Sequence, residues 1–298
     1  MKILNFGSCN IDYVYSMDHI VRVGETETTE KMEVFPGGKG LNQSIAVARA
    51  GAKVYHAGCV GEDGEMLTHL LAESGVDVSL LRTVDAKNGH AIIQVSAKGE
   101  NSIFLFPGSN DMVTKDYIDG VLEQFAPDDI LLLQNEISNV DYIIKAAHEK
   151  KMRIVFNPSP INDKIAEIDL SMLYCLILNE VEAGEITGCD STDGALAYFR
   201  EKYPQLKVML TLGSRGSVYM DGEREIRQRA YLVDVVDTTA AGDTFTGYFL
   251  AGLADGEDPE KTLQIATAAS AIAVSQMGAA PSIPKRDEVL SRLAKLIG

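Results

Sequence analysis

Basic residues are scarce in this sequence. Of its 298 residues, 27 are Lys or Arg and 43 are Asp or Glu, which gives a formal net charge of −16 at pH 7. Proteins that bind polyanions gather positive charge on their surface. The deficit therefore argues against nucleic acid and against an anionic membrane as partners. It leaves room only for a local basic pocket that holds a small phosphate group.

Cysteines and long apolar runs are also few. The four cysteines form no Cys-x-x-Cys pair and no histidine is spaced to complete a zinc site, so we expect four reduced thiols. No apolar run approaches the roughly 18 residues that a membrane-spanning helix needs. The segment after Met1 is too short for the core of a signal peptide and lacks a small-residue cleavage pattern. We expect a soluble protein of the cytoplasm.

The residues that are present predict an α/β fold. Hydrophobic residues make up 46% of the chain, enough for a core that needs no disulfide or metal. Apolar strands alternate with amphipathic helices, which favours a parallel sheet with helices on both faces. The predicted buried strands are Ile3–Phe6, Val54–Cys59, Ile130–Leu133, Ile154–Phe156, Cys175–Leu178 and Val208–Leu212. The predicted helices are Leu41–Ala50, Gly64–Ser74, Val140–Lys150 and Glu180–Ile186, and glycine stop signals mark several of their ends.

Two regions break this alternation. Ala91–Val95 and Ser102–Phe106 flank a short polar turn and predict a β-hairpin. Tyr13–Val23 and Thr28–Phe35 are also strand-like, with Gly24 between them. These four segments either form a small separate sheet or extend the edge of the main one.

No P-loop and no Gly-x-Gly-x-x-Gly turn after the first strand is present, so a phosphate site must be built in another way. The best candidate is the segment 237–247. Its small residues, Ala240, Ala241 and Gly242, lie where apolar residues at helical spacing begin. The free N–H groups and the dipole of a helix N-terminus favour an anion there. Asp243 fits two interpretations, a helix N-cap or a catalytic base.

A glycine-rich turn opens the predicted helix Leu41–Ala50. Three glycines in the segment 37–40 let a ligand approach the backbone closely. Lys39 and Asn42 then offer a charge and an amide suited to hydroxyl groups. The alternative is a tight strand-to-helix turn that contains an incidental lysine.

Polar residues also follow several predicted strands, at the sheet edge where open α/β folds bind ligands. Asn10, Asp12 and Glu136 suit substrate hydroxyls, although a turn-forming role explains them equally well. Asn179 and Glu182 fit a capping box or a Mg²⁺ site. The turn Thr211–Gly216 fits a phosphate or ribose contact, or a simple hairpin.

Taken together, these segments resemble the ribokinase family, the sugar and nucleoside kinases of the PfkB type, from about Ile3 to the last helix. Segment 37–43 is similar to the family's N-terminal signature and segment 237–245 to its C-terminal one. Asn179-x-x-Glu182 and the segments 211–216 and 278–284 match ribokinases in the same order. The resemblance implies a ribokinase-like α/β fold over residues 1–298, with a mostly parallel sheet. It also implies a small β lid inserted from roughly residues 12–36 and 90–107.

The resemblance further implies an ATP-dependent kinase that phosphorylates the primary hydroxyl of a small sugar, foremost D-ribose to ribose 5-phosphate. Other sugars, a nucleoside, or a non-catalytic sugar- or nucleotide-binding protein remain alternatives. Mg²⁺ and a monovalent cation, K⁺, are the implied cofactors beside ATP. Pairing of lids implies a homodimer, since exposed strand edges are a liability in a monomer.

The family's roles map onto this chain residue by residue. The implied catalytic group is Asp243 with the anion hole Ala240, Ala241 and Gly242, which reverses the weight from cap to base. The implied sugar contacts are Asn10, Asp12, Gly38, Lys39, Asn42, Glu136 and Asp243. The implied nucleotide contacts are Asn179 and Glu182, which would serve the phosphate and Mg²⁺, and Thr211, Gly213, Ser214 and Gly216, which would line the nucleotide. The implied monovalent-cation site comprises Asp237, Thr239, Ala273, Gln276, Gly278 and Ser282.

Overall fold

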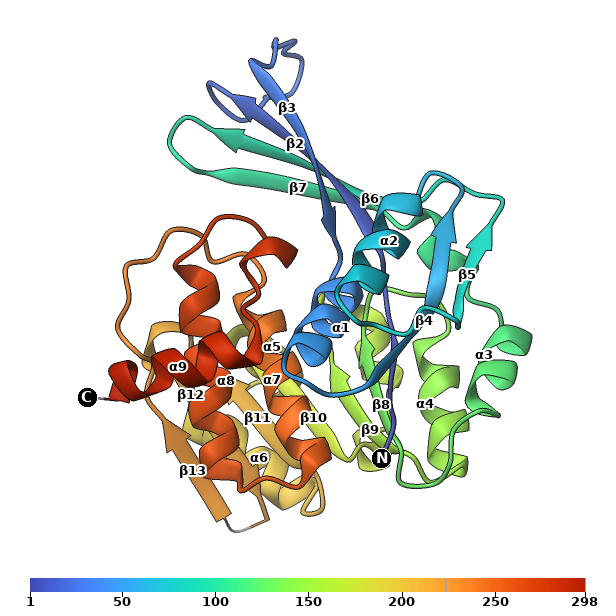
Figure 1. The fold of residues 1–298 in the computed structure, drawn as a ribbon, viewed down its shortest axis with the longest axis vertical. Helices are drawn as coiled ribbons and strands as arrows, with labels where there is room; N and C mark the ends of the chain where they lie inside the picture. The colour runs from blue at the N-terminus through green and yellow to red at the C-terminus, as the bar shows by residue number, and fades with distance from the viewer. Residues whose placement is uncertain (223, 298) are drawn as a thin grey trace.

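A nine-stranded sheet forms the centre of the molecule (Figure 1). The computed structural model describes residues 1–222 and 224–297. The strand order is β13-β12-β11-β10-β9-β8-β1-β4-β5, and every pair is parallel except the two that involve β12. The strands are β1 (Ile3–Phe6), β4 (Val54–Gly61), β5 (Leu81–Val84), β8 (Ile130–Gln134), β9 (Arg153–Asn157), β10 (Cys175–Asn179), β11 (Lys207–Thr211), β12 (Ser217–Asp221) and β13 (Arg224–Gln228). The predicted α/β class is confirmed.

Helices cover both faces of this sheet, as the alternation predicted. The helices are α1 (Lys39–Arg49), α2 (Glu65–Glu73), α3 (Lys115–Leu122), α4 (Val140–Glu149), α5 (Glu180–Thr187), α6 (Thr192–Lys202), α7 (Ala241–Asp255), α8 (Pro259–Val274) and α9 (Arg286–Ile297). Alternate strand residues point to opposite faces. Ile3 packs into the cluster that holds α1, α7 and α8, whereas Leu4 and Phe6 pack into the cluster that holds α3 and α4.

For the helices and the strands of the main sheet, the predicted boundaries lie within two residues of the observed ones. The helix predicted from Leu41 begins at Lys39, because Gly38 is its N-cap and adopts φ 95°. The glycines predicted to stop helices do adopt positive φ, at 96° for Gly51, 89° for Gly75 and 69° for Gly188. Only a residue without Cβ takes that conformation at little cost, so the positions of these glycines predict the helix ends.

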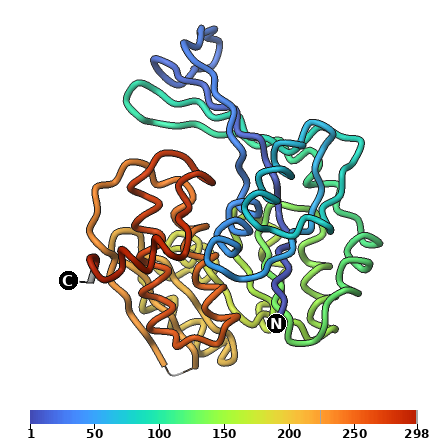
Figure 2. The backbone as a smooth tube through the Cα atoms, viewed as in Figure 1, coloured from blue at the N-terminus to red at the C-terminus, as the bar shows by residue number. Residues whose placement is uncertain are grey.

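A second, smaller sheet stands apart from the main one. Its order is β3-β2-β6-β7, from β2 (Asn10–Met17), β3 (Lys31–Gly37), β6 (Gly89–Ser96) and β7 (Asn101–Phe106). The β2–β6 pair is parallel and the other two are antiparallel. The sheet projects beyond the body of the molecule at the top of Figures 1 and 2. The separate-sheet alternative is therefore correct, but the strand predicted over 13–23 ends at Met17, where a long loop begins.

Strand register determines which residues share a face of the small sheet. Asp12 pairs with Phe35 on β3 and with Ala91 on β6, and Ala91 pairs with Leu105 on β7. Directly paired residues point the same way, so these four side chains lie on one face. Their neighbours along each strand, including Phe104, point to the other face.

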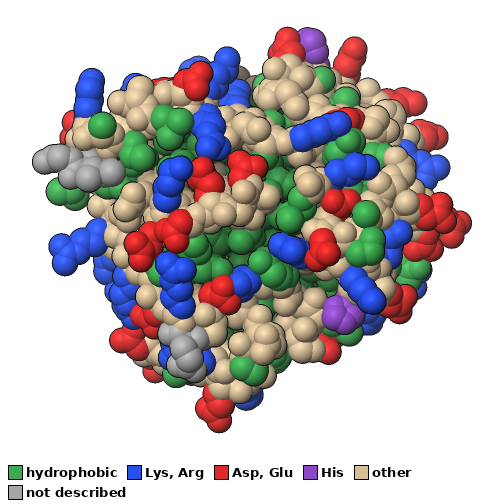
Figure 3. All heavy atoms as spheres, turned by 60° about the horizontal axis from the view of Figure 1, so that its bottom comes forward, with side chains coloured by type: hydrophobic (Ala, Val, Ile, Leu, Met, Phe, Trp, Pro, Cys, Tyr) green, Lys and Arg blue, Asp and Glu red, His purple; other side chains and the backbone are tan. Residues whose placement is uncertain are grey.

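The end of the molecule opposite the small sheet is shown in Figure 3. Hydrophobic side chains gather at the centre of this view, with charged side chains of both signs around them. Within residues 1–222 and 224–297, none of the helices combines the length and hydropathy of a membrane span. All four cysteines are free, as the sequence predicted.

Candidate active site

The N-terminus of α7 places Asp243 in a buried polar contact. The N-cap is Ala240, in the left-handed conformation at φ 57°, and Asp243 is the third helical residue. The N-cap interpretation of Asp243 is therefore wrong. Its Oδ2 accepts a hydrogen bond from Asn42 Nδ2 at 3.1 Å and its Oδ1 accepts one from Gln43 Nε2 at 2.9 Å. The carboxylate faces α1, not the backbone of its own helix.

A cavity of about 220 Å³ opens at this helix N-terminus. Eight of the residues singled out in the sequence line it together: Lys39, Asn179, Glu182, Thr211, Ala240, Ala241, Gly242 and Asp243. The backbone N–H groups of Gly242 and Asp243 have no acceptor within the described chain, whereas that of Ala241 donates to Thr238 O at 3.3 Å. Two free N–H groups beside a carboxylate form a place where an anion and a hydroxyl could meet.

Lys39 is the positive charge of this cavity. Burial alone would lower its pKa, but the carboxylates of Asp243, Glu136 and Glu182 outweigh that effect and raise the pKa. The ammonium group thus stays charged among three acidic side chains. Asp243 lines the same cavity as Lys39, as the kinase interpretation requires.

Two further carboxylates belong to this region: Glu136 follows β8, and Asp12 lies near the start of β2. Glu136 Oε2 accepts hydrogen bonds from Ser8 Oγ and from the backbone N–H of Lys39. Burial raises the pKa of Glu136 despite these bonds and the nearby Lys39. Burial, together with the charge of Glu136, raises the pKa of Asp12 to about 6. A Cβ on Gly37 would collide with the Asp12 carboxylate, so any larger residue there would displace that side chain.

Asn10 and Gly38 complete the sugar-side set of predicted residues. Asn10 is buried and its Oδ1 accepts a hydrogen bond from Asn110 Nδ2 at 2.7 Å. A Cβ on Gly38 would lie 3.1 Å from the Asn10 backbone nitrogen. The predicted sugar contacts therefore occupy one connected region, which runs from Asp243 through Lys39 and Glu136 to Asp12.

A second cavity is lined by four of the predicted nucleotide contacts. Thr211, Gly213, Ser214 and Gly216 border this space of about 370 Å³. It shares Thr211, Thr238, Ala241 and Gly242 with the first cavity. Its other wall is largely apolar, formed by Tyr231, Leu232, Val233, Val235, Phe245, Ala271 and Val274. A polar junction next to an apolar chamber suits phosphates joined to a flat base.

Asn179 and Glu182 confirm the capping-box interpretation, whereas the Mg²⁺ interpretation stays a prediction. They form a capping box at the start of α5, with Asn179 Oδ1 accepting from Glu182 N and Glu182 Oε2 accepting from Asn179 N, each at 2.9 Å. Both side chains also line the first cavity. Capping fixes their position and leaves Glu182 Oε1 without a hydrogen bond to the described chain.

The predicted cation residues are only partly brought together by direct contacts. Asp237 Oδ1 accepts from the backbone N–H and the hydroxyl of Thr239, and its Oδ2 accepts from Gly278 N at 2.9 Å. Burial would raise the pKa of Asp237, but these bonds outweigh it and lower the pKa. Gln276 N donates to Ala273 O, and Ser282 bonds to Ala279 O. The end of α8 reaches Asp237 through Val274 O.

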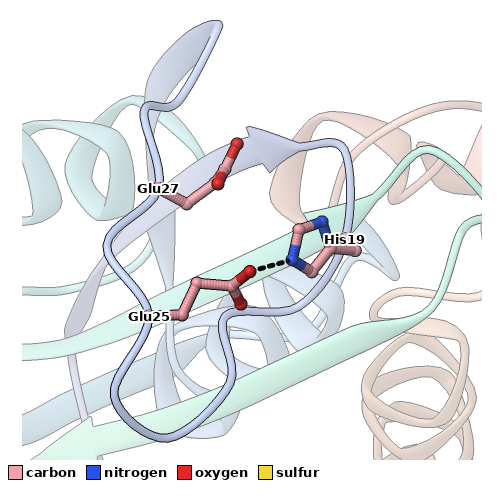
Figure 4. Close-up of side chains that lie close together, drawn as sticks. All are labelled: His19, Glu25 and Glu27. Atoms are coloured by element: carbon pink, nitrogen blue, oxygen red, sulfur yellow. Dashed lines mark hydrogen bonds and ion pairs between the residues drawn. The ribbon is translucent and has the colours of Figure 1, made fainter.

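A separate group of possible metal ligands lies in the loop between β2 and β3. Within the described ranges, His19, Glu25 and Glu27 are the residues grouped closely enough to share an ion (Figure 4). His19 Nε2 lies 2.9 Å from Glu25 Oε1, and its Nδ1 lies 3.4 Å from Asp18 Oδ2. Hydrogen bonds that His19 donates to these carboxylates raise its pKa. An exposed ion pair accounts for the group, and we assign it no metal.

Several residues of the site escaped the sequence analysis. Gln43 was read only as part of a motif, and Asn157, Ser159 and Thr246 also line the first cavity. Asn157 ends β9 just as Glu136 follows β8, so the strand-end rule could have found it. The segment 230–235 carries no periodic signal, and nothing in it predicted the apolar wall.

Comparison with known proteins identifies a family and several relatives of this chain. A family model described as pfkB family carbohydrate kinase matches residues 1–286. The chain belongs to this family. This carbohydrate kinase is 36% identical over 298 residues to the ribokinase of Haemophilus influenzae, with 96% of each chain covered.

Solved structures agree with that assignment. The kinase superimposes on the ribokinase of Cryptococcus neoformans in complex with ADP at a TM-score of 0.86, with 34% identity over 98% of this chain and 99% of the other. It superimposes on the ribokinase of Arabidopsis thaliana complexed with ribose and ATP at 0.86, with 28% identity over 98% of each chain. The fold is ribokinase-like, as the five motifs implied.

Proposed function

We propose that this carbohydrate kinase transfers the γ-phosphoryl group of ATP to the primary hydroxyl of D-ribose, forming ribose 5-phosphate and ADP. The observation that carries the proposal is the position of Asp243. Its buried carboxylate lies beside two free N–H groups and Lys39, between the sugar-side residues and the nucleotide-side cavity. That arrangement suits a base that meets a hydroxyl in front of a phosphate.

In this proposal, transfer proceeds in line. The sugar O–H bond breaks as a new O–P bond forms, Asp243 takes the proton, and the bond between the γ-phosphorus and the β,γ-bridging oxygen breaks to release ADP. The N–H groups at the start of α7, with the helix dipole, stabilise charge on the transferred group. Lys39 adds a fixed positive charge that water does not screen well.

We also propose that the small sheet is a lid within a single α/β domain, contributed by roughly residues 12–36 and 90–107. The face that carries Asp12 also carries Ala91, Leu105 and Phe35, so an apolar surface surrounds the carboxylate. Closing that face over the sugar excludes water and suppresses hydrolysis of ATP.

The donor sets of the site fit two cations, and we include both in the proposal. Glu182 Oε1 and the phosphate oxygens of ATP would hold Mg²⁺, which neutralises phosphate charge. Oxygen atoms of Asp237, Thr239, Ala273, Gln276, Gly278 and Ser282 would hold K⁺ beside the loop that leads into α7. We further place the enzyme in the cytoplasm.

The direct test is ADP release across a panel of sugars and nucleosides, each with and without K⁺. D-ribose is expected to give the highest kcat/KM, and K⁺ is expected to raise it. A higher kcat/KM for deoxyribose, fructose, a keto-deoxy sugar acid or a nucleoside would identify that compound as the substrate. The assignment to the kinase family would stand. No turnover of any acceptor would favour a binding protein.

The affinity for ribose is expected to weaken below about pH 6. The pKa of Asp12 is raised to about 6 in the folded protein, so a proton binds as the pH falls through that value. A neutral carboxyl accepts hydrogen bonds from sugar hydroxyls more weakly, and KM should rise by up to about tenfold per pH unit. The measurement is ribose KM against pH at saturating ATP. In Asp12→Asn the rise should vanish; if it persists, Glu136 is the group that titrates.

We propose a homodimer formed through the small sheet. Its edge strands β3 and β7 carry exposed apolar side chains, including Phe104 at 55% and Val34 at 42% exposure, on the face away from Asp12. Such a surface favours a partner with the same surface. Light scattering should give twice the mass of one chain, and Phe104→Asp should give monomers. Leu290→Asp, at an exposed leucine on α9, is the control and should stay dimeric.

A further inference from the structure

A buried chain of side-chain amides ends at the Asp243 carboxylate. Gln43 in α1 is 1% exposed, and its Nε2 donates to Asp243 Oδ1 at 2.9 Å. The same nitrogen lies 3.2 Å from Asn157 Oδ1. On the other side, Gln43 Oε1 accepts a hydrogen bond from Gln134 Nε2 at 2.7 Å. Gln43 therefore joins the α7 carboxylate to the centre of the main sheet.

Backbone carbonyls fix the direction of one end of this chain. Asn5 Nδ2 donates to Gly40 O at 2.7 Å and to Ser44 Oγ at 2.8 Å. Because a carbonyl cannot donate, the Asn5 amide must turn its nitrogen toward Gly40 and its oxygen toward Gln134. Gln134 then has to donate, and its Nε2 lies 3.0 Å from Asn5 Oδ1 as well as near Gln43.

The other end is fixed in the same way. Asn157 Nδ2 donates to Ile177 O at 2.9 Å, so its oxygen faces Gln43. Gln43 thus meets a donor at Gln134 and an acceptor at Asn157. Both neighbours compel it to turn its NH₂ group toward Asp243, and the opposite amide orientation would leave two buried mismatches.

Asn42, the other donor to Asp243, is not locked in this way. Its Nδ2 donates to Asp243 Oδ2, but its Oδ1 is buried without a hydrogen-bond partner in the described structure. The bond to Asp243 is the one hydrogen bond that the Asn42 side chain makes in the described structure, so an arriving hydroxyl can replace that contact without breaking another. Oδ1 of Asp243 is therefore held by a donor of fixed orientation, whereas Oδ2 is held by a donor that a substrate hydroxyl can replace.

We propose that Gln43, itself oriented by Gln134, is a positioning residue that pins Asp243 Oδ1 and leaves Oδ2 as the atom that takes the substrate proton. The inference rests on the proposed role of Asp243 as base. A charge-assisted bond to Oδ1 holds the carboxylate plane in one orientation through the reaction. Gln43 is absent from both cavity linings, so it acts through Asp243 and not on the substrate.

The test separates turnover from binding. Gln43→Met keeps the length and volume but removes the donor, and kcat is expected to fall about tenfold to hundredfold. KM for ribose and for ATP should stay within about twofold, because no substrate contact is lost. A merely structural role would instead lower the melting temperature and the active fraction, with kcat per active site unchanged. Active-site titration and thermal melting distinguish the two.

Gln43→Glu gives a second, independent signature. The introduced carboxyl has the same shape, donates to Asp243 only when protonated, and repels it when ionised. We expect kcat to fall as the pH rises, unlike wild type. Wild-type turnover at every pH in this variant would overturn the proposal, because shape alone would then suffice.

Gln134→Met covers the case in which the Gln43 variants fail to fold. It touches neither Asp243 nor a cavity, yet releases the Gln43 amide, and kcat should fall about threefold to tenfold. Thr262→Val replaces a buried threonine whose hydroxyl has no hydrogen-bond partner in the described structure, and should leave kcat unchanged. An active Asp243→Asn enzyme would refute the proposed base itself. An inactive one beside wild-type turnover in both Gln43→Met and Gln134→Met would refute only this inference.

Discussion

Replacing Asp243 with asparagine is expected to lower kcat by about 10²–10⁴-fold, the usual contribution of a general base. The asparagine side chain has the same size and keeps an oxygen for the Gln43 or Asn42 donor, so the site should keep its shape. It cannot take the proton of the sugar hydroxyl at neutral pH. Ribose affinity, measured by calorimetry, should therefore remain close to that of wild type while ADP release almost stops.

Asp255→Asn is the matched control for this experiment. It makes the same change at an exposed position at the far end of α7, and turnover should be unaffected. More than about a tenth of wild-type kcat in Asp243→Asn would show that another group accepts the proton, since even the weakest general bases contribute about 10²-fold. Lost ribose binding would show that the carboxylate mainly shapes the sugar site.

Gly247→Ala is expected to damage stability and turnover together. Gly247 lies in α7 directly against α1, where an added Cβ would collide with Ala46 Cβ and lie 2.7 Å from Val47 N. The backbone of α1 cannot move aside as a flexible side chain can, so the two helices must move apart. This movement should lower the free energy of unfolding by about 1–3 kcal/mol. The same movement separates Asp243 from Gln43, and a displacement of about 1 Å can cost about 10²-fold in rate.

Gly120→Ala supplies the control for Gly247→Ala. It adds the same methyl group to an exposed position of α3, with no atom within 4 Å of the new Cβ. Alanine favours helix over glycine by about 1 kcal/mol, so this variant should melt slightly higher than wild type. Thermal melting and kcat are measured on both variants. Equal behaviour of the two would show that α1 and α7 tolerate wider spacing.

Much of the fold could be predicted from the sequence because the central strands are buried on both faces of the sheet. Ile130–Leu133 reads as an unbroken apolar run, and such runs mark the centre of a parallel sheet. Glycine stops at positions such as Gly51 marked the helix ends. The edge elements were harder, because β13 is mostly exposed and carries no such run. The strand from Tyr13 was drawn too long, since β-branched residues continue into a loop that tertiary contacts, not propensity, define.

The candidate site was predictable where a residue's type and its place at a strand or helix end coincide. Asp243 and Lys39 were found in this way, but the cap interpretation of Asp243 was wrong. A carboxylate at the third helical position can turn toward a neighbouring helix, and sequence spacing does not reveal which neighbour is there. The Gln43 contact depends on residues 200 positions apart, and no local pattern encodes it.

That same separation has a consequence for synthesis of the chain. Lys39, Asn42 and Glu136 all lie within the first half of the sequence, whereas Asp243 follows some 200 residues after its two amide partners. Because the ribosome makes the chain from its N-terminus, the proposed sugar contacts emerge long before the proposed proton acceptor. A polypeptide stalled ahead of α7 would contain the carboxylates of the proposed sugar site but not the proposed base Asp243. If Asp243 is the base, phosphoryl transfer can begin only after most of the chain has been made.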